Sequence, residues 1–319
     1  MPDQSAPSAP TLAIFCAALV LAQGCWLMPA AAASSVQQRP QASGIEFRYQ
    51  REQQPELSFV LDPSSLTSQH SGQRRYSVAL AQSFVRQQLL LEGVKLQQQG
   101  FVLHLSPPSQ PLTFRLDGPA ATLAQQQQRL TQLQQQAYQQ YLTQGLYYQL
   151  TTPQGGRYII PDHVAILRQQ LPALKPVANA FAALYSTKNI RKVASEVALW
   201  IQQIPYQDLS DRQHSAGTGF VSPWQLLHQH SGDCDSKAVL FAGVMKQIFP
   251  NMALAILYFP DHAVVAAQIP ALKNETTVTL KEQPLLVIDA TGPAETAIGT
   301  LARPYQLYLQ NRQFNYRLF

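Results

Sequence analysis

A cysteine, a histidine and an aspartate follow one another in the second half of this chain and could form a nucleophilic site. Cys234 stands in the hexapeptide Gly-Asp-Cys-Asp-Ser-Lys at 232–237, and His262 and Asp289 come later at the edges of apolar runs. The other two of the three cysteines lie in an apolar leader. Without that leader Cys234 has no partner for an intramolecular disulfide, so it is either a packing residue or a reactive group.

The residues after Cys234 predict a helix over 236–249 that ends at Pro250. A thiol at a helix N-terminus faces unpaired backbone N–H groups and the positive end of the helix dipole. Together with a nearby imidazolium, these lower a thiol pKa from about 8.5 toward about 3.5–7.5. We therefore expect a low pKa for Cys234. Gly232 allows a sharp bend before the helix, and the N–H of Cys234 could donate to an oxyanion.

His262 and Asp289 suit the two remaining roles of a triad. His262 opens an extended run over 262–269, where its imidazole could accept the thiol proton and later protonate a leaving amine. Asp289 ends the strand-like run 285–288, where its carboxylate could orient the far ring nitrogen. The plainer alternatives are a core cysteine, a core or surface histidine, and an aspartate that caps a turn.

This arrangement resembles the transglutaminase-like superfamily of cysteine peptidases and amide acyltransferases, over roughly residues 185–295. The matching stretches are Gly-Asp-Cys-Asp at 232–235, His-Ala-Val-Val at 262–265, Ile-Asp-Ala-Thr at 288–291 and Ile-Pro-Tyr at 204–206. The resemblance implies an α+β fold, in which a helix bearing the cysteine packs on an antiparallel sheet bearing the histidine and the aspartate.

Carried over to this chain, the resemblance makes Cys234 the nucleophile, His262 the base and Asp289 the orienting acid. It leaves the second oxyanion donor open among Tyr206, Gln207 and Trp200, of which we favour Tyr206. A thioacyl-enzyme of this kind needs no cofactor.

A metal site is the main chemical alternative at this place in the chain. His228, His230, Asp233 and Cys234 are compactly spaced and of types that bind zinc or copper. Side chains two residues apart diverge on a helix, however, so His228 and His230 are poorly placed to share one ion. We therefore expect no metal.

The first 33 residues read as an export signal. Thr11–Ala33 is the long apolar segment, and four alanines at 30–33 followed by serines supply the small residues of a cleavage site. Residues 1–10 contain no Lys or Arg, so an uncleaved membrane anchor is an alternative, and lipidation at Cys25 is another. All three imply export, and the Gln-rich, weakly charged composition indicates a bacterial periplasmic protein.

The composition argues against nucleic-acid binding. The formal charge is +5, but the basic residues are scattered along the chain rather than clustered. We expect a protein or peptide substrate, with membrane contact only through an uncleaved leader.

The remaining residues divide into a linker at 34–44, an N-terminal α+β domain at 45–165 and a catalytic domain at 166–319. The N-terminal domain is expected to contain a helix at 120–144 with a glutamine-rich face, a stretch at 78–99 that fits helix or strand, and a segment at 161–176 that joins the two domains. Its strands are expected at 45–49, 57–61, 101–105, 112–116, 146–150 and 157–160.

Taken together, these patterns predict an exported cysteine peptidase that hydrolyses amide bonds through a thioacyl-enzyme. A transamidase on the same triad is the first alternative, because the acceptor of the acyl group depends on whether the cleft admits water or an amine. The second is an inactive envelope protein that binds a partner, for which the N-terminal domain is the expected binding part.

Overall fold

The computed structural model of this protein describes residues 35–50, 54–65, 75–209 and 219–319, all of which belong to one compact unit. The expected leader over residues 1–33 lies outside these ranges. In the described ranges, no helix combines the length and the apolar character that a membrane span requires. The fold is mixed α+β, and its sheets are antiparallel, as predicted.

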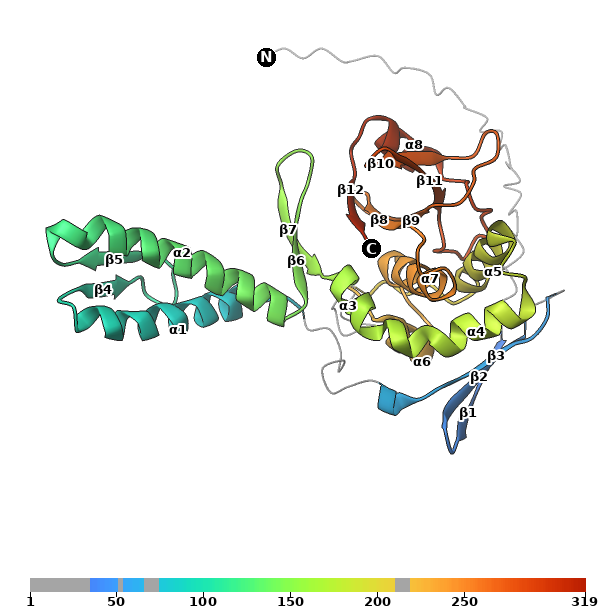
Figure 1. Ribbon diagram of the computed structural model, residues 1–319, viewed down its shortest axis with the longest axis horizontal. Coiled ribbons are helices and arrows are strands. Elements are labelled where there is room, and N and C mark those ends of the chain that lie inside the picture. The colour runs from blue at the N-terminus through green and yellow to red at the C-terminus, as the bar shows by residue number, and fades with distance from the viewer. Residues whose placement is uncertain (1–34, 51–53, 66–74, 210–218) are drawn as a thin grey trace, which may run out of the picture. The chain divides into compact units, whose positions relative to one another are not determined.

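The largest sheet has five strands in the order β10-β11-β9-β8-β12 (Figure 1). Its strands are β8 (Leu254–Tyr258), β9 (Ala263–Ala267), β10 (Thr277–Leu280), β11 (Gln283–Ile288) and β12 (Asn315–Leu318). Strands β9 and β11 are antiparallel neighbours, with Ile288 opposite Val265. The start of β9 therefore lies beside the end of β11, where His262 and Asp289 are expected.

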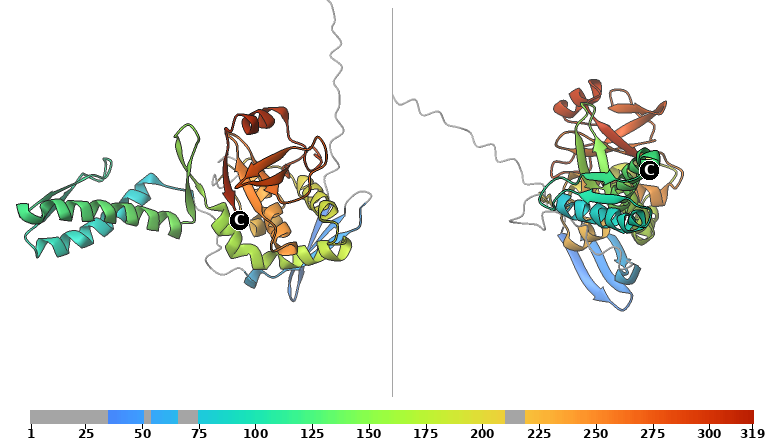
Figure 2. Two further views of the ribbon diagram at one scale, coloured as in Figure 1. Left: turned by 45° about the horizontal axis from the view of Figure 1, so that its top comes forward. Right: turned by 90° about the vertical axis from the view of Figure 1, so that its left-hand side faces the viewer.

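Each face of this sheet is covered by a different helix. Alternate residues of β9, such as Val265, belong to a core that the sheet shares with α7 (Cys234–Ile248). The residues between them, such as Val264, belong to a second cluster that tyrosines of α8 (Arg303–Gln310) complete. This period-2 alternation is that of a strand buried on both faces. Figure 2 shows α7 and α8 on opposite sides of the sheet.

Helix α7 is the centre of the larger core. Its residues 236–245 are all buried, and four further helices pack against it. These helices are α3 (His163–Gln170), α4 (Lys175–Leu184), α5 (Ile190–Gln202) and α6 (Pro223–Gln229), with a short 3₁₀ turn at Leu171–Leu174 between α3 and α4. The predicted helices after Lys188, Pro223 and Cys234 are confirmed. The segment at 161–176, expected to join the two domains, is mostly helical and packs on α7.

A three-stranded sheet formed by β1 (Ser35–Gln41), β2 (Gly44–Gln50) and β3 (Leu57–Leu61) shares the same core. The Tyr49 ring packs edge-on against the fully buried Trp200 of α5, with 5.4 Å between ring centroids. The prediction of a linker at 34–44 is therefore wrong for the residues that the structure describes. The glutamine, proline and serine of this segment are typical of a linker, but residues 35–41 form β1, whose backbone pairs with β2.

A second region has a hydrophobic cluster of its own. It comprises α1 (Val78–Gln97), β4 (Val102–Leu105), β5 (Phe114–Asp117) and α2 (Ala120–Gln144). The ambiguous stretch at 78–99 is thus a helix, and its N-cap is Ser77, whose side chain accepts from the Leu80 N–H. The predicted hairpin is present as β6 (Tyr147–Thr151) and β7 (Arg157–Pro161).

The hydrophobic contacts therefore divide the expected N-terminal domain into two groups. Strands β1 to β3 complete the core around α7, whereas α1, α2, β4 and β5 pack on one another. The domain boundary near residue 165 stays a prediction.

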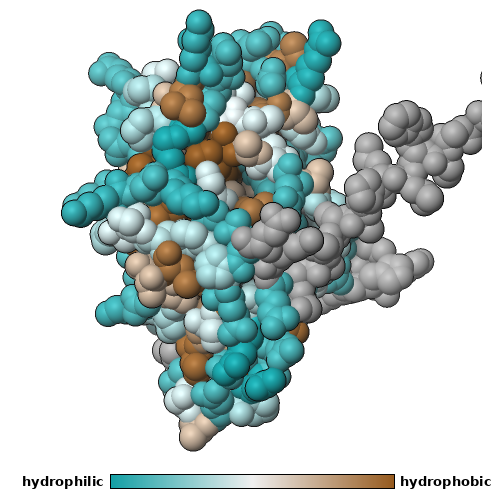
Figure 3. Space-filling model, turned by 90° about the vertical axis from the view of Figure 1, so that its right-hand side faces the viewer, coloured by the Kyte–Doolittle hydropathy of each residue, from teal (hydrophilic) through white to brown (hydrophobic). Residues whose placement is uncertain are grey.

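Figure 3 shows one face of the molecule, on which hydrophobic side chains form small separate groups among hydrophilic ones.

Two fully buried leucines test this division. Leu57 belongs to the core around α7, and Leu130 belongs to the hydrophobic cluster of the α1–α2 region. Leu57→Ala should lower the free energy of unfolding of the core around α7 by about 2–5 kcal/mol, because it removes buried methyl groups and leaves a cavity. Leu130→Ala should leave that core unchanged and destabilise only the α1–α2 region. Denaturant unfolding followed by tryptophan fluorescence reports the core through Trp200, and amide exchange reports the α1–α2 region. Equal effects of both variants on the fluorescence transition would contradict the division.

Candidate active site

His262 and Asp289 are hydrogen-bonded. The His262 Nε2 atom lies 2.9 Å from Asp289 Oδ2, and both side chains are largely buried. Because His262 immediately precedes β9 and Asp289 immediately follows β11, the antiparallel pairing of these strands brings the two residues together. The bond occupies Nε2, so Nδ1 is the ring nitrogen left to accept a proton.

The Asp289 carboxylate is held by further contacts. Its Oδ1 atom accepts from the Thr291 backbone N–H at 3.0 Å. Burial raises the pKa of Asp289, but the hydrogen bond and charge of His262, together with the bonds from Thr291, outweigh burial and leave this pKa below its usual value. Asp289 is therefore a carboxylate at neutral pH.

The loop that follows Asp289 is fastened to the end of α5. The buried Gln202 side chain donates to the backbone carbonyls of Asp289 at 2.6 Å and Thr296 at 2.9 Å, and it accepts from the Thr296 N–H at 3.1 Å. Gly292 lies in the left-handed region with φ +65°, and a Cβ there would stand 2.1 Å from the Gln202 carbonyl oxygen. A glycine is therefore required at this close approach.

Tyr305 of α8 stacks on the His262 ring, with 4.6 Å between centroids and 27° between planes. The contact helps to fix the plane of the imidazole. Tyr305 carries no signal in the sequence, because α8 was not predicted and nothing in the local pattern links residue 305 to residue 262.

Cys234 is the first residue of α7, as predicted, and it is partly exposed. Asp233 is the N-cap, and its side chain accepts from the Ser236 N–H. The sulfur lies near the start of β9, where the backbone of Ala263, the residue after His262, forms a hydrogen bond that lowers the thiol pKa. Among the described residues no hydrogen bond joins the Cys234 sulfur to the His262 ring. The structure therefore brings the three predicted residues to one place and connects two of them directly.

The low thiol pKa expected for Cys234 is wrong for this structure. Burial, followed by the charges of Asp235 and Asp233, raises the pKa of Cys234 to about 12, and backbone hydrogen bonding by Ala263 and Asp235 only partly opposes this rise. The helix N-terminus favours a thiolate, but the two acids beside the cysteine and the loss of water act more strongly. Cys234 is therefore a neutral thiol at neutral pH.

The two acids that flank Cys234 share a hydrogen bond between their carboxyl groups. Two carboxyl groups can bond in this way only if one of them carries a proton. Burial and the neighbouring charge of Asp235 raise the pKa of Asp233 to about 9, and burial also raises the pKa of Asp235, so the pair shares one proton at neutral pH.

His163 lies behind this carboxyl pair and was not singled out by the sequence. Its Nε2 atom is 3.1 Å from Asp235 Oδ2, and its Nδ1 atom is 2.8 Å from the Tyr258 hydroxyl. Burial lowers the pKa of His163 to about 4, so the ring is neutral at pH 7. Its position at the start of α3 carries no sequence signal, because α3 meets α7 only through tertiary packing.

Tyr206 is brought to the site by a short parallel bridge to Gly232. The Gly232 carbonyl accepts from the Gln207 N–H at 3.1 Å, and the Gly232 N–H donates to the Pro205 carbonyl at 3.3 Å. Burial, followed by the charges of Cys234 and Asp233, raises the pKa of Tyr206 to about 12, so its hydroxyl is a donor at neutral pH. The half-exposed Tyr206 fits the oxyanion role better than Trp200, which is fully buried in the core. Gln207, whose side-chain oxygen accepts from Ser231, stays the open alternative.

One more charged group lies beside these residues. Lys237 is fully buried one turn after Cys234, and burial lowers the pKa of its ammonium to about 8 against the opposing charge of Asp289.

The alternative metal set is not assembled. Among the residues that the structure describes, no group of three or more His, Cys, Asp or Glu side chains is placed to hold an ion. His228 stacks on Trp224 with 4.9 Å between centroids, and His230 faces the Tyr49 ring.

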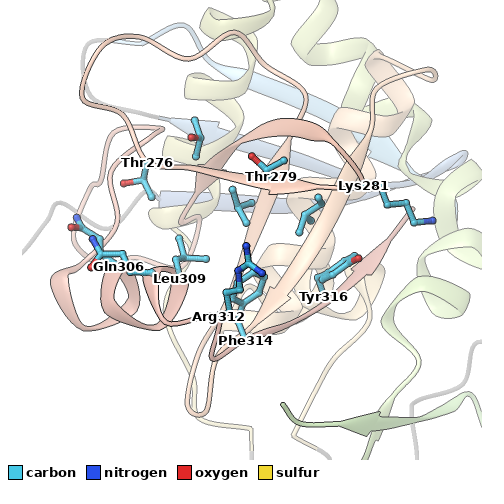
Figure 4. A pocket seen from close by; sticks show the side chains of 12 residues that line it. Thr276, Thr279, Lys281, Gln306, Leu309, Arg312, Phe314 and Tyr316 are labelled. Carbon is cyan, nitrogen blue, oxygen red and sulfur yellow. The ribbon is translucent and has the colours of Figure 1, made fainter. Parts of the chain in front are cut away.

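A separate hollow of about 710 Å³ lies over the α8 side of the sheet (Figure 4). Its lining comes from β10 and the turn after it, from α8, and from β12 and the segment that leads into it. It includes Thr279, Lys281, Arg312, Phe314 and Tyr316. None of the four predicted site residues lines it.

Comparison of the sequence with protein-family models and with curated proteins found no match to either.

The charge on Asp235 can be tested through the reactivity of the thiol. Asp235→Asn removes the group whose charge, after burial, raises the thiol pKa most, so the thiol pKa should fall and alkylation by iodoacetamide near pH 8 should accelerate about tenfold for each pKa unit of that fall. Asp233→Asn is the comparison, because the charge of Asp233 acts less strongly on the thiol and asparagine is an equally good N-cap, so its acceleration should be smaller.

The measurement is the rate of modification of the Cys234 peptide by mass spectrometry over a range of pH. In the unchanged protein the rate should be low at pH 7 and should still be rising at the highest pH at which the protein stays folded. An equal acceleration in both variants would contradict the larger effect assigned to Asp235.

Proposed function

We propose that this chain is a transglutaminase-like cysteine hydrolase that cleaves amide bonds through a thioacyl-enzyme. The observation that carries the proposal is the hydrogen bond between His262 and Asp289 at the strand ends next to the start of the Cys234 helix. A carboxylate that holds one imidazole nitrogen leaves the other free, and this is the arrangement that a nucleophile–base pair requires.

In the proposed reaction the thiol loses its proton as it attacks. The sulfur of Cys234 forms a bond to the carbonyl carbon of the substrate while its proton passes to Nδ1 of His262. The high thiol pKa favours this coupled step over a resting thiolate–imidazolium pair. Catalytic hydrogen bonds commonly tighten only with bound substrate, so the resting structure without a sulfur–imidazole bond is compatible with the step.

The remaining steps use the same groups. The carbonyl oxygen becomes an oxyanion, for which the Cys234 N–H and the Tyr206 hydroxyl are the proposed donors. Collapse of this intermediate breaks the bond to the leaving amine, and the imidazolium of His262 protonates that amine. His262 then takes a proton from water as the water oxygen attacks the thioester carbon. The bond between that carbon and the sulfur breaks, the acid is released, and His262 returns the proton to the Cys234 sulfur. An amine in place of water would make the protein a transamidase.

One part of the proposal rests on the sequence alone, and another is supported by the fold. An exported, periplasmic site of action follows from the leader at 1–33, which lies outside the described residues. A transglutaminase-like core is supported by the cysteine helix packed on the antiparallel sheet that carries the histidine and the aspartate.

A small activated ester tests the acyl-enzyme directly. With 4-nitrophenyl acetate, the full chain should release a burst of nitrophenolate equal to the number of sites and gain an acetyl group on Cys234. Cys234→Ser should abolish the burst, and His262→Ala should slow it on the order of 10²–10⁴-fold, because the general base is lost. Stopped-flow absorbance and intact-mass spectrometry give the two readouts.

The same experiment separates the alternatives. If added primary amines capture the acetyl group faster than water does, the transamidase alternative is favoured. A burst that survives in Cys234→Ser would overturn the enzyme proposal and leave the inactive envelope protein, in which the α1–α2 region is the candidate partner-binding part.

Tyr206→Phe tests the oxyanion donor. Loss of the hydroxyl should slow acylation on the order of 10²-fold, with little change in the concentration of ester that gives half the maximal rate, because the donor acts on charge that forms in the transition state. Tyr316→Phe, at a partly exposed tyrosine on the other side of the sheet, is the control. Equal rates for Tyr206→Phe and the unchanged protein would exclude Tyr206 from this role.

A further inference from the structure

Lys237 is a buried cation with two well-defined partners. Its side chain is 0 % exposed, and its Nζ atom donates to the backbone carbonyls of Ile204 and Thr291, each at 2.5 Å. An ammonium group out of contact with water is costly unless its hydrogen bonds are satisfied. The neighbouring buried positions of α7 are mostly apolar, so packing alone does not call for a lysine here.

Both partners of Lys237 belong to segments that carry a site residue. Ile204 stands two residues before Tyr206, and Thr291 stands two residues after Asp289. Thr291 also donates its own N–H to the Asp289 carboxylate, which in turn holds His262. Lys237 itself lies one turn after Cys234 on α7. One ammonium group therefore joins the three segments on which the proposed nucleophile, orienting acid and oxyanion donor stand.

The other side-chain hydrogen bonds that hold the loop after Asp289 do not involve α7. Gln202 ties the Asp289 loop to α5, but its hydrogen bonds reach only Asp289 and Thr296. Among the side-chain hydrogen bonds of the described residues, those of Lys237 are the ones that tie α7 to the loop after Asp289. Displacement of that loop would move the carboxylate and the imidazole away from the sulfur.

We propose that Lys237 is a positioning residue, which holds the Asp289 loop and the Tyr206 segment in register with Cys234. This inference rests on the proposed function, because it assigns Lys237 to the geometry of that same site. It predicts a defect in the chemical step and in the His262–Asp289 hydrogen bond, beyond any loss of stability.

Lys237→Met tests the inference, since methionine fills similar space but donates no hydrogen bond. Lys246→Met is the matched control, because Lys246 lies at the far end of the same helix and also donates to a backbone carbonyl, that of Met252 at 2.9 Å. The full chain would be compared well below the melting temperature of each variant. The acetylation rate of Cys234 by 4-nitrophenyl acetate gives one readout. The downfield N–H signal of His262 in protein labelled with ¹⁵N-histidine gives the other.

Lys237→Met should slow acetylation on the order of 10- to 10²-fold, because small displacements of reacting groups have large effects on rate. It should also shift or broaden the His262 signal. Lys246→Met should stay within about twofold of the unchanged protein. A folded Lys237→Met variant with an unchanged rate and an unchanged signal overturns the inference.

Two further outcomes are decisive. If Lys237→Met does not fold, Lys237→Arg and Lys237→Gln provide milder changes, and rescue of rate and signal by arginine supports the inference. If no variant at position 237 folds, the lysine serves stability alone and the inference fails. If the unchanged protein shows no acetylation that depends on Cys234, the proposed function fails, whereas the His262 signal still reports whether Lys237 holds the loop.

Discussion

The packing of one buried helix against an antiparallel sheet is the constraint on which the rest of this structure depends. Helix α7 is surrounded by four helices and the sheet, so polar groups at its N-terminal end need partners inside the protein. Asp233 caps the helix, Lys237 bonds two backbone carbonyls, and the Asp233–Asp235 pair shares a proton. The candidate site thus consists of buried polar groups, and each of them needs a hydrogen-bond partner within the protein because water does not supply one.

The same burial explains why the thiol differs from a simple helix-start cysteine. A helix N-terminus favours a thiolate by a modest electrostatic effect that water screens readily. Around Cys234 burial and the charges of Asp235 and Asp233 act more strongly, so the neutral thiol is the stable form. The proposed chemistry then depends on His262 as a base during attack, and Asp289 matters because it stabilises the imidazolium that forms.

Much of the architecture follows from local patterns. The helix after Cys234 and the strands beside His262 and Asp289 were predictable, because their apolar residues recur with helical or extended spacing. The order of the three residues was also sufficient to propose a triad. In contrast, β1 looked like a linker, α4 and α8 were not predicted, and the roles of Tyr305, His163 and Lys237 had no local signal. Each of these depends on a contact with a segment far away in the chain.

The sequence by itself determined the residue types, the capped start of α7 and the strand ends on which His262 and Asp289 stand. Only the tertiary structure decided which ring nitrogen of His262 is engaged, that Tyr206 reaches the site through Gly232, and that the thiol is neutral. The physical reason is that propensity and periodicity act over a few residues, whereas burial, charge–charge interaction and strand register are set by neighbours that the fold brings together.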